Sequence, residues 1–251
     1  AFRDSLTINS PSLGGGIDVT GSLQTTDPDV VVTFNGAFAT TELSDNIDTS
    51  GGDYIVNDSV EVLAGSTVTI HTDGGDIKID GTLNGQGGAG VEHLILDAGT
   101  GSITFNANIG TVVPLDSITI LSAGSVTING QIFVTNAFTL NSAASIAFNG
   151  NVTVGSIDLT AANSITFGST GTQVELTTTS GSIELWVDKD STGLIDFVGN
   201  VFSADDLIIK EAKNVTFGAF IVAVDGDLIQ EVGSNETKFA GSVAASNVDL
   251  R

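Results

Sequence analysis

Apolar and polar residues alternate along this chain in short runs of the form Ile-Thr-Phe-Asn-Gly. The run appears at Val32–Gly36, returns at Val126–Gly130 and Ile146–Gly150, and recurs in weaker form up to Thr237–Gly241. Alternation with a period of two predicts β-strands that bury one face and leave the other in water. The runs recur about every twenty residues, which predicts a solenoid whose coils bury their apolar faces against one another.

The first apolar residue of each run defines the register of the coils: Val32, Tyr54, Ile77, Ile103, Val126, Ile146, Ile165, Ile195, Val215 and Thr237. Two residues later, side chains should stack as an apolar core ladder: Phe34, Val56, Ile79, Phe105, Ile128, Phe148, Phe167, Phe197, Phe217 and Phe239. At the following turn, polar side chains should hydrogen-bond along the fibre axis in a structural ladder: Asn35, Asn57, Asp80, Asn106, Asn129 and Asn149.

Each coil carries two further inward segments. One is another short strand, here called the return strand, which begins at Leu94, Ile118, Phe138, Ile157, Val174 or Leu207. The other is an inward position six residues after the register residue: Phe38, Val60, Leu83, Ile109, Ile132, Val152, Val201, Ile221 and Val243.

Strands that recur once per coil should pair in parallel with those of the next coil, through right-handed crossovers. We therefore predict an all-β chain that folds as a right-handed parallel β-helix (β-solenoid) of about ten coils. Residues 1–251 should form a single domain. A pattern break or insertion is expected around residues 182–194, because the step from Ile165 to Ile195 is the longest.

Both ends of the chain fall within the repeat. Asp4–Asn9 matches the return-strand pattern of Asp116–Ile120, and Asn247–Leu250 is another return strand. No polar capping segment is visible at either end, and uncapped ends leave backbone groups unpaired. We expect either a longer parent chain or subunits that stack end to end.

The charge of the chain is strongly acidic, with 30 Asp and Glu against 7 Lys and Arg and a net charge of -23. Nucleic-acid binding depends on basic side chains that neutralise phosphates, so this composition argues against it. Docking on an anionic membrane is disfavoured for the same reason. Cysteine is absent, so disulfides and thiol chemistry are excluded. No apolar run is long enough to span a bilayer, so no membrane insertion is expected.

The clearest local motif lies at the break in the repeat, at Asp188–Asp196. Side-chain oxygens occupy positions one, three and five, Gly193 occupies position six, and Asp196 occupies position nine, as in the front of a calcium loop. The predicted ligands of Ca²⁺ are Asp188, Asp190, Thr192, Asp196 and the backbone carbonyl of Leu194. Gly199 stands where a bidentate Glu is expected, so a further ligand would come from elsewhere or from water. The alternative is a polar surface insertion.

Other candidate chemistry is weaker. Gly85–Gly90 has the spelling of a dinucleotide fingerprint, but a strand follows it where that motif needs a helix. Parallel β-helices include polysaccharide lyases and hydrolases, but neither His71 nor His93 has an obvious catalytic partner. Trp186 and Tyr54 are the candidate sugar-stacking residues. Outward Thr residues such as Thr33 could bind ice, although Lys78 interrupts their row. We expect no enzymatic activity.

The repeat sequences at Gly101–Phe105, Ala123–Gly130 and Ser156–Ala161 resemble those of secreted bacterial adhesins of the filamentous haemagglutinin type. The resemblance covers about residues 30 to 250 and implies a β-solenoid shaft, export to the cell surface, and a role in attachment or extracellular matrix. We predict a structural, non-enzymatic segment of an extracellular adhesin or biofilm-matrix filament. Its partners would be copies of itself or further repeats. The alternative is a carbohydrate-binding or carbohydrate-active β-helix.

Overall fold

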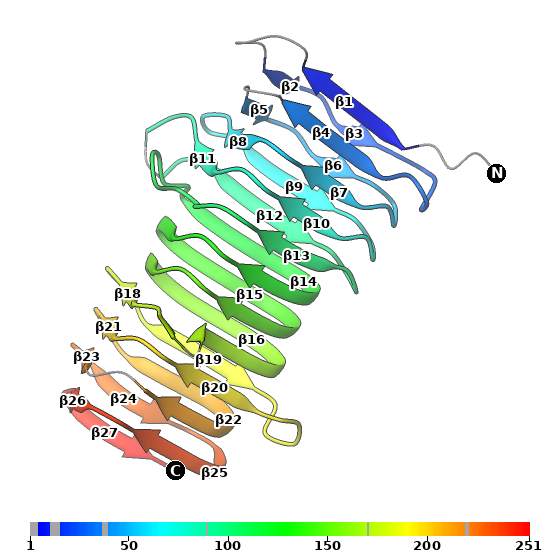
Figure 1. Cartoon of the computed structure of the whole chain (residues 1–251). Helices are drawn as coiled ribbons and strands as arrows, with labels where there is room; N and C mark the ends of the chain where they lie inside the picture. Colours follow the sequence, from blue (N-terminus) through cyan, green and yellow to red (C-terminus); the bar gives the residue numbers. More distant parts are fainter. Residues whose placement is uncertain (1–4, 11–15, 37–39, 89, 170, 219–220) are drawn as a thin grey trace. The chain divides into compact units, whose positions relative to one another are not determined.

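The computed structural model is all-β, and its parallel strands stack as a β-solenoid of about 10 turns, which confirms the predicted fold class (Figure 1). It describes residues 5–10, 16–36, 40–88, 90–169, 171–218 and 221–251. The chain divides into two compact units, residues 1–135 and 136–251, and the division falls inside strand β15 (Ile132–Phe148).

The first unit contains three rows of parallel strands, and each coil contributes one strand to each row. The row formed by the repeated Ile-Thr-Phe-Asn-Gly run is called the phrase row, and its strands are phrase strands. Its parallel pairing aligns, from coil to coil, Leu6, Val32, Tyr54, Ile77, Ile103 and Val126. Its strands are β1 (Leu6–Ser10), β4 (Val32–Gly36), β7 (Tyr54–Val56), β10 (Ile77–Ile79), β13 (Ser102–Phe105) and the end of β14 (Ser117–Ile128).

The middle row follows the phrase strand of each coil and forms a four-stranded sheet of β2 (Ile17–Val19), β5 (Thr40–Leu43), β8 (Ser59–Val62) and β11 (Leu83–Gly85). Isolated bridges extend this row from Leu83 to Ile109 and Ile132. The return row consists of β3 (Leu23–Gln24), β6 (Ile47–Asp48), β9 (Thr67–His71), β12 (His93–Asp97) and the start of β14.

The second unit repeats the same three rows. Its phrase row contains β16 (Val152–Ser169), β20 (Leu194–Phe197), β22 (Leu207–Phe217) and β25 (Gly233–Phe239). Its middle row contains the start of β16, β18 (Leu176–Thr178), β21 (Val201–Ser203), β23 (Ile221–Val224) and β26 (Ser242–Ala244). Its return row contains the centre of β16, β19 (Ile183–Val187), the start of β22, β24 (Asp227–Gln230) and β27 (Asn247–Leu250).

The predicted register of the phrase row is confirmed within each unit, but two strand assignments and one inward residue were wrong. Ser5–Asn9 is not a return strand, because Leu6 pairs with Val32 in the phrase row. Val174–Leu176 leads into the middle row, where Leu176 pairs with Val152, and the return strand of that coil is β19. The inward residue of β23 is Val222, which is 2% exposed, whereas the predicted Ile221 is 45% exposed.

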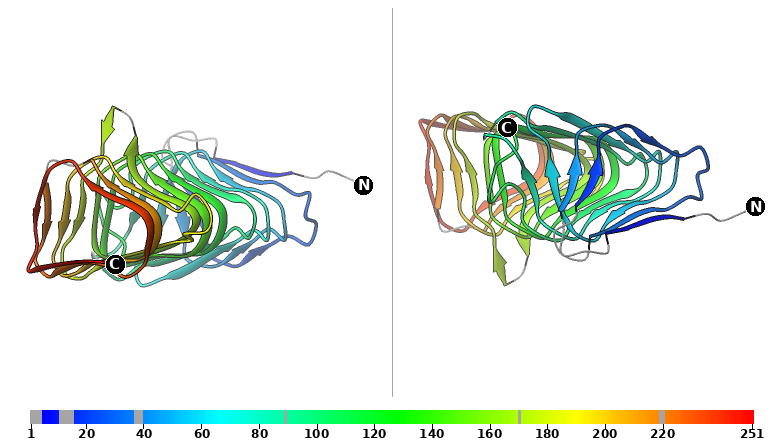
Figure 2. Two further views of the ribbon diagram at one scale, coloured as in Figure 1. Left: turned by 90° about the horizontal axis from the view of Figure 1, so that it is seen from below. Right: turned by 90° about the horizontal axis from the view of Figure 1, so that it is seen from above.

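A short hairpin accounts for the displaced return strand. The end of β16 pairs antiparallel with β17 (Thr172–Gln173), and this hairpin projects from the outline of the coils (Figure 2). The hairpin adds residues between the phrase strand and the middle strand, so every later inward position of that coil moves along the sequence. The predicted inward residue Phe38 lies outside the described residues, and Thr41 occupies the middle-row position that pairs with Val60.

The core of each unit is the predicted apolar ladder. Every ladder residue from Phe34 to Phe217 is at most 1% exposed. In the second unit the rings of Phe148, Phe167, Phe197, Phe217 and Phe239 stack nearly parallel, with centroids 4.7 to 5.2 Å apart. Burial of each aromatic side chain contributes about 1.5–3 kcal/mol before the cost of ordering it. The rings therefore stack at the spacing that the paired strands impose, and they fill the core of the second unit.

The polar ladder also forms. Asn35 donates to Asn9 at 3.0 Å, Asn57 donates to Asn35 at 2.6 Å, and Asn129 donates to Asn106 at 2.8 Å. Asp80 takes part as the acceptor of Asn106. The ladder is interrupted at Asp80, because a carboxylate accepts from Asn106 and Lys78 but has no proton to donate to Asn57. On either side of this break each amide donates to the coil before it, as a structural ladder requires.

Candidate functional site

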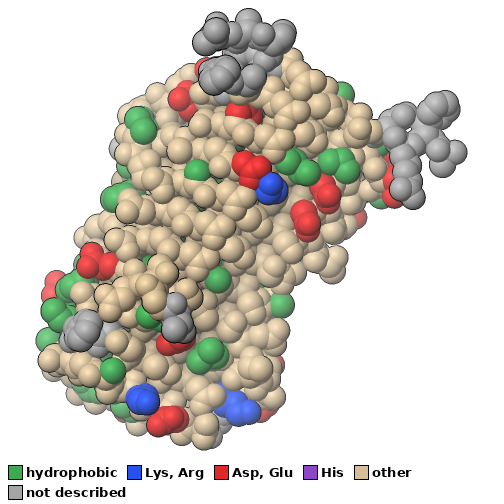
Figure 3. Space-filling view, in the orientation of Figure 1, with side chains coloured by type: hydrophobic (Ala, Val, Ile, Leu, Met, Phe, Trp, Pro, Cys, Tyr) green, Lys and Arg blue, Asp and Glu red, His purple; other side chains and the backbone are tan. Residues whose placement is uncertain are grey.

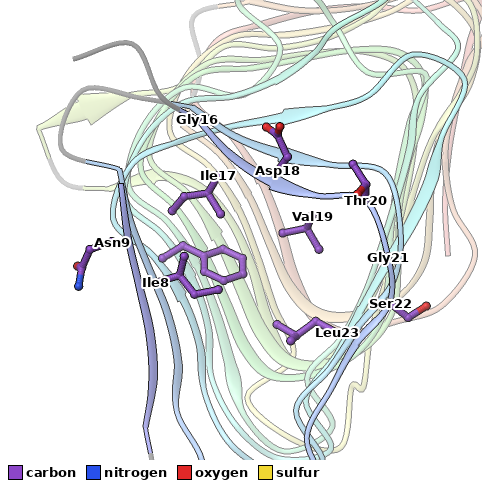
Figure 4. Close-up of a pocket in the computed structure, with 11 residues that line it drawn as sticks. Ile8, Asn9, Gly16, Ile17, Asp18, Val19, Thr20, Gly21, Ser22 and Leu23 are labelled. Atoms are coloured by element: carbon purple, nitrogen blue, oxygen red, sulfur yellow. The ribbon is translucent and has the colours of Figure 1, made fainter. Parts of the chain in front are cut away.

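The N-terminal end of the first unit is an open cross-section of the core. A cavity of about 510 Å³ lies there, lined by side chains that include Ile8, Ile17, Val19, Leu23 and Phe34. Figure 4 shows the side chains of Ile8, Ile17, Val19 and Leu23 inside the coil, while Asn9 and Ser22 point away from it. In the described part of the chain, β1, β2 and β3 each have a parallel partner in the following coil alone.

The C-terminal end of the second unit is open in the same way. Strands β25, β26 and β27 pair with β22, β23 and β24, and no further parallel partner is present among the described residues. Inward side chains of this last coil remain in water: Val243 is 36%, Val248 49% and Leu250 46% exposed. Phe239 covers Phe217 with one ring face. Each end therefore presents three unpaired strand edges around apolar side chains.

The predicted calcium ligands occupy a turn and the strand that follows it. Asp188 closes the turn, because its Oδ1 accepts from the Asp190 backbone N–H at 2.9 Å. Thr192 Oγ1 donates to the Asn163 carbonyl at 2.9 Å. Leu194 and Asp196 belong to β20, which is hydrogen-bonded on both sides, and burial raises the pKa of Asp196.

Within the described residues no group of three or more His, Cys, Asp or Glu side chains is arranged to hold a metal ion. Lys189 also lies beside the turn, with its Nζ 4.0 Å from the Asp190 carboxylate. Calcium binding at this turn stays a prediction.

Trp186 lies on the outward face of the return row in the second unit, and polar side chains surround it. It pairs with Thr160 on one side and, across a β-bulge, with Glu211 on the other. Hydrogen bonds from the Lys189 ammonium and backbone, with one from Trp186, hold the pKa of Glu211 below its ordinary value. Bulges re-aim side chains, and here the bulge brings Glu211 beside Trp186. The indole therefore lies partly exposed on the outward face of β19, with its N–H directed to Glu211.

A second charged group adjoins Trp186. Glu184 Oε2 lies 2.5 Å from Lys210 Nζ, and Asp158 is the cross-strand neighbour of Glu184. Burial raises the pKa of Asp158, with Lys210 opposing and Glu184 reinforcing that shift. The set of Asp158, Thr160, Glu184, Trp186, Lys210 and Glu211 is called the Trp186 surface below. The other predicted sugar-stacking residue was wrong: Tyr54 is 0% exposed in the core.

The two histidines lie on the outward face of the return row in the first unit, each beside a carboxylate. His71 Nδ1 lies 3.2 Å from Asp97 Oδ2, and Ser122 hydrogen-bonds Asp97 rather than the imidazole. His93 Nδ1 lies 3.2 Å from Asp116 and 2.8 Å from Ser117. A nucleophilic triad needs the serine and the carboxylate on opposite ring nitrogens. Here both contacts of His93 use Nδ1, so this geometry is not that of a triad.

Most Lys and Arg side chains of the described residues form ion pairs. Lys78 pairs with Asp80 at 2.8 Å, Lys189 with Glu211 at 3.1 Å, and Arg251 with Asp249 at 2.6 Å. On the face shown in Figure 3, the few Lys and Arg side chains lie beside Asp or Glu side chains. This arrangement gives no basic patch on that face to hold an anionic polymer.

Two buried carboxylates have no counterpart in the sequence prediction. Asp58 accepts from Thr41 Oγ1 at 3.0 Å, and burial raises its pKa. Glu92 is 0% exposed and accepts from the Gly87 backbone N–H at 2.8 Å. Within the described structure, Asp58 Oδ1, Glu92 Oε2 and the Tyr54 hydroxyl have no hydrogen-bond partner. The signal for Asp58 was its place one residue before the middle strand, where a polar side chain can turn inward.

Comparison with known proteins gives no relative: no family model, no curated protein and no solved structure matches the chain. No helix of the described residues has the length and apolarity needed to cross a membrane.

Proposed function

We propose that this chain is a structural, non-enzymatic segment of an extracellular adhesin or matrix filament at a bacterial cell surface. It would extend by end-to-end stacking, either with copies of itself or with further repeats of a longer chain. The observation that carries the proposal is that each end leaves three strand edges unpaired around an apolar cross-section. The resemblance of the repeats to secreted adhesins supports the setting.

Stacking would satisfy groups that the isolated ends leave open. Unpaired strand edges are templates for another chain, and a parallel partner would complete their hydrogen bonds. Burial of the exposed parts of Val243, Val248 and Leu250 would add the hydrophobic term, at roughly 25 cal/mol for each Å² removed from water. The sides of the coils also expose apolar side chains, such as Val112 and Phe133, but the ends combine exposed apolar side chains with unpaired strand edges, which favours association there.

Electron microscopy and light scattering of the purified chain test this proposal. We expect rods that lengthen with protein concentration. Val248→Asp should shorten them, because it places a charge where the next copy would bury an apolar side chain. Val112→Asp makes the same substitution at a 79% exposed position away from both terminal coils, so it is the matched control and should leave the lengths unchanged. Single monomers at every concentration would remove stacking between copies and leave further repeats of a longer chain as the partner of the ends.

Carbohydrate binding is the second candidate function, and the Trp186 surface favours it. A partly exposed aromatic ring on an outward face, with carboxylates and ammonium groups beside it, offers stacking for a sugar ring and hydrogen bonds for its hydroxyls. Trp186 is the only Trp of the chain, so its fluorescence reports directly on this surface. A neutral glucan and a neutral mannan are suitable probes, because the net charge of -23 would repel an anionic polysaccharide. A change of emission that saturates with added polysaccharide, and that is lost in Glu211→Gln, would support binding; unchanged emission with both would remove it.

We also propose Ca²⁺ as a secondary ligand of the Asp188–Asp196 turn. The support is the order of oxygen-bearing residues in the sequence. Bound calcium stabilises the folded state by mass action. The melting temperature should therefore rise with calcium and fall back with chelator, and Asp190→Asn should abolish the rise. An unchanged melting temperature in the unmodified chain would remove calcium from the proposal.

A further inference from the structure

The two open ends carry the same three rows in the same chain order. At the N-terminal end the phrase, middle and return strands are β1, β2 and β3, and at the C-terminal end they are β25, β26 and β27. A second copy placed against either end therefore meets one strand edge of each row. The direction of the strands then decides which end it meets.

We infer that the C-terminal end of one copy binds the N-terminal end of the next, with β25 beside β1, β26 beside β2 and β27 beside β3 in one continuous register. The inference rests on the proposed end-to-end stacking and adds its polarity and register. Only this head-to-tail contact keeps every strand pair parallel, as all row pairings inside the units are. Two identical ends facing each other would be related by a twofold axis, which makes the pairs antiparallel and closes the assembly at a dimer.

The register follows from extending each row by one step. The phrase row ends with Val215 beside Thr237 and begins with Leu6 beside Val32, so Thr237 should meet Leu6 of the next copy. By the same rule Val243 meets Ile17, and Val248 meets Leu23.

The apolar side chains of the two ends complement each other in this register. Phe239 continues the ring stack of the second unit and would lie against Ile8, one of the residues that line the N-terminal cavity. Val243 and Val248, half-exposed in the single copy, would lie against Ile17 and Leu23 of the same cavity (Figure 4). The cavity of about 510 Å³ is thus where the core of the preceding copy would continue.

Charges separate this contact from the symmetric one. In the head-to-tail register Glu236 faces Ser5, Asp249 faces Gln24, and Asp18 faces Ala244, so no carboxylate meets a carboxylate. Arg251 follows Leu250 and would lie opposite Thr26, next to Asp27. Two N-terminal ends would instead bring their own acidic residues together, namely Asp18, Asp27 and Asp29, without a Lys or Arg in residues 16–31.

Disulfide trapping tests the register, because the chain has no cysteine of its own. Thr7 and Lys238 are outward neighbours in the inferred pairing, so their Cα atoms should lie about 5 Å apart, within disulfide range. Oxidation of a Thr7→Cys, Lys238→Cys double variant should yield a ladder of covalent multimers on a non-reducing gel. The matched control, Thr7→Cys with Glu236→Cys, is offset by two residues and separates the Cα atoms by about 8 Å. It should give no ladder.

The outcomes separate the register from the stacking itself. Suppose that the reduced double variant forms rods. If oxidation then gives a ladder of multimers in the control variant, or in neither variant, the register is overturned and end-to-end stacking stays intact. Covalent dimers from Thr7→Cys alone would show that two N-terminal ends meet and would overturn the polarity. Monomers alone by light scattering, in the unmodified chain and in both variants, would overturn stacking and register together.

Discussion

At the scale of single residues, close backbone approach at one corner excludes any side chain. A Cβ added to Gly75 would lie 2.2 Å from the Gly52 carbonyl oxygen, and one added to Gly101 would lie 2.1 Å from the Gly75 oxygen. Thr72 supports this corner by donating to the Gly75 carbonyl at 2.5 Å. The sequence shows the Gly pairs of these turns, but only the stacked coils reveal that the neighbouring backbone is what requires them.

Gly75→Ala should destabilise the first unit. The added methyl meets backbone atoms that cannot move without shifting the adjoining coil, so we expect a loss of about 1–3 kcal/mol or more, as for overpacked cores. Urea denaturation measures the change. Gly21→Ala is the matched control, because nothing lies within 4 Å of its added Cβ. Equal stability of the two variants would contradict the stacked corner.

Two aspartates should respond to pH with opposite signs. Burial alone would raise the pKa of Asp97, but hydrogen bonds from Ser122 and the Gly99 N–H, with the charge of His71, hold it below its ordinary value of 3.8. Asp97 therefore stabilises the fold above that value, and the stabilisation is lost as pH falls through the lower folded pKa. Asp97→Asn should therefore be less stable than the unmodified chain at pH 7. The difference in stability between the two proteins should become smaller below about pH 3.8, where the carboxylate becomes protonated.

Asp58 provides the contrast. Its pKa is raised by burial, against hydrogen bonds that include one from Thr41, so ionisation above the ordinary value of 3.8 costs stability. Asp58→Asn removes that cost and should stabilise the chain at pH 7 with little effect near pH 3. Melting temperatures of both variants across this range provide the measurement. Parallel shifts in the two variants would show that these environments are misassigned.

At the scale of elements, the phrase row was predictable and the other rows only in part. Phe, Ile and Val alternate with Thr in the phrase strands, and the Asn that follows marks the end of each one, so the register from Val32 to Val126 could be read from spacing. The middle strands carry no such marker. One additional residue between Val215 and the middle strand places Val222 inward in place of Ile221. The hairpin at β17 moves the next return strand to β19.

The site was predictable to a smaller extent. Trp186 was singled out by residue type, but its contact with Glu211 depends on a bulge that spacing does not show. The open ends were expected, because no polar cap was visible in the sequence. The strand types at the N-terminal end were not, since Ser5–Asn9 fits both the phrase and the return pattern. Only the pairing of Leu6 with Val32 distinguishes them.

The ring stack of the second unit predicts a strong dependence on single Phe residues. Phe197 has parallel rings on both sides, with centroids 5.2 Å from Phe167 and 4.8 Å from Phe217. Phe197→Ala should cost about 3–5 kcal/mol, since the cavity opens between two rigid coils. Phe202→Ala is the control, because Phe202 lies on the outward side of β21. Denaturant titration should show a much smaller loss of unfolding free energy for Phe202→Ala than for Phe197→Ala. Equal losses in the two variants would contradict the assigned inward face.

At the scale of the whole molecule, net charge opposes the association that the ends favour. Each copy carries a net charge of -23, so approaching copies repel each other over distances set by the ionic strength. The screening length falls from about 30 Å at 0.01 M salt to about 8 Å at 0.15 M. Rods should therefore lengthen as salt rises over this range, because repulsion is screened while the apolar contact at the ends is not.

Light scattering at fixed protein concentration measures this salt dependence. Val248→Asp separates screening from contact, because it damages the end and leaves the remaining charges in place. We expect that variant to stay short at every salt concentration, since screening removes repulsion but does not restore an apolar surface. Rods of the unmodified chain that shorten with salt would show that charge pairs, such as the one inferred between Arg251 and Asp27, hold the ends together instead of buried apolar area. In that case repulsion between the acidic side chains of neighbouring copies would not be what limits rod length.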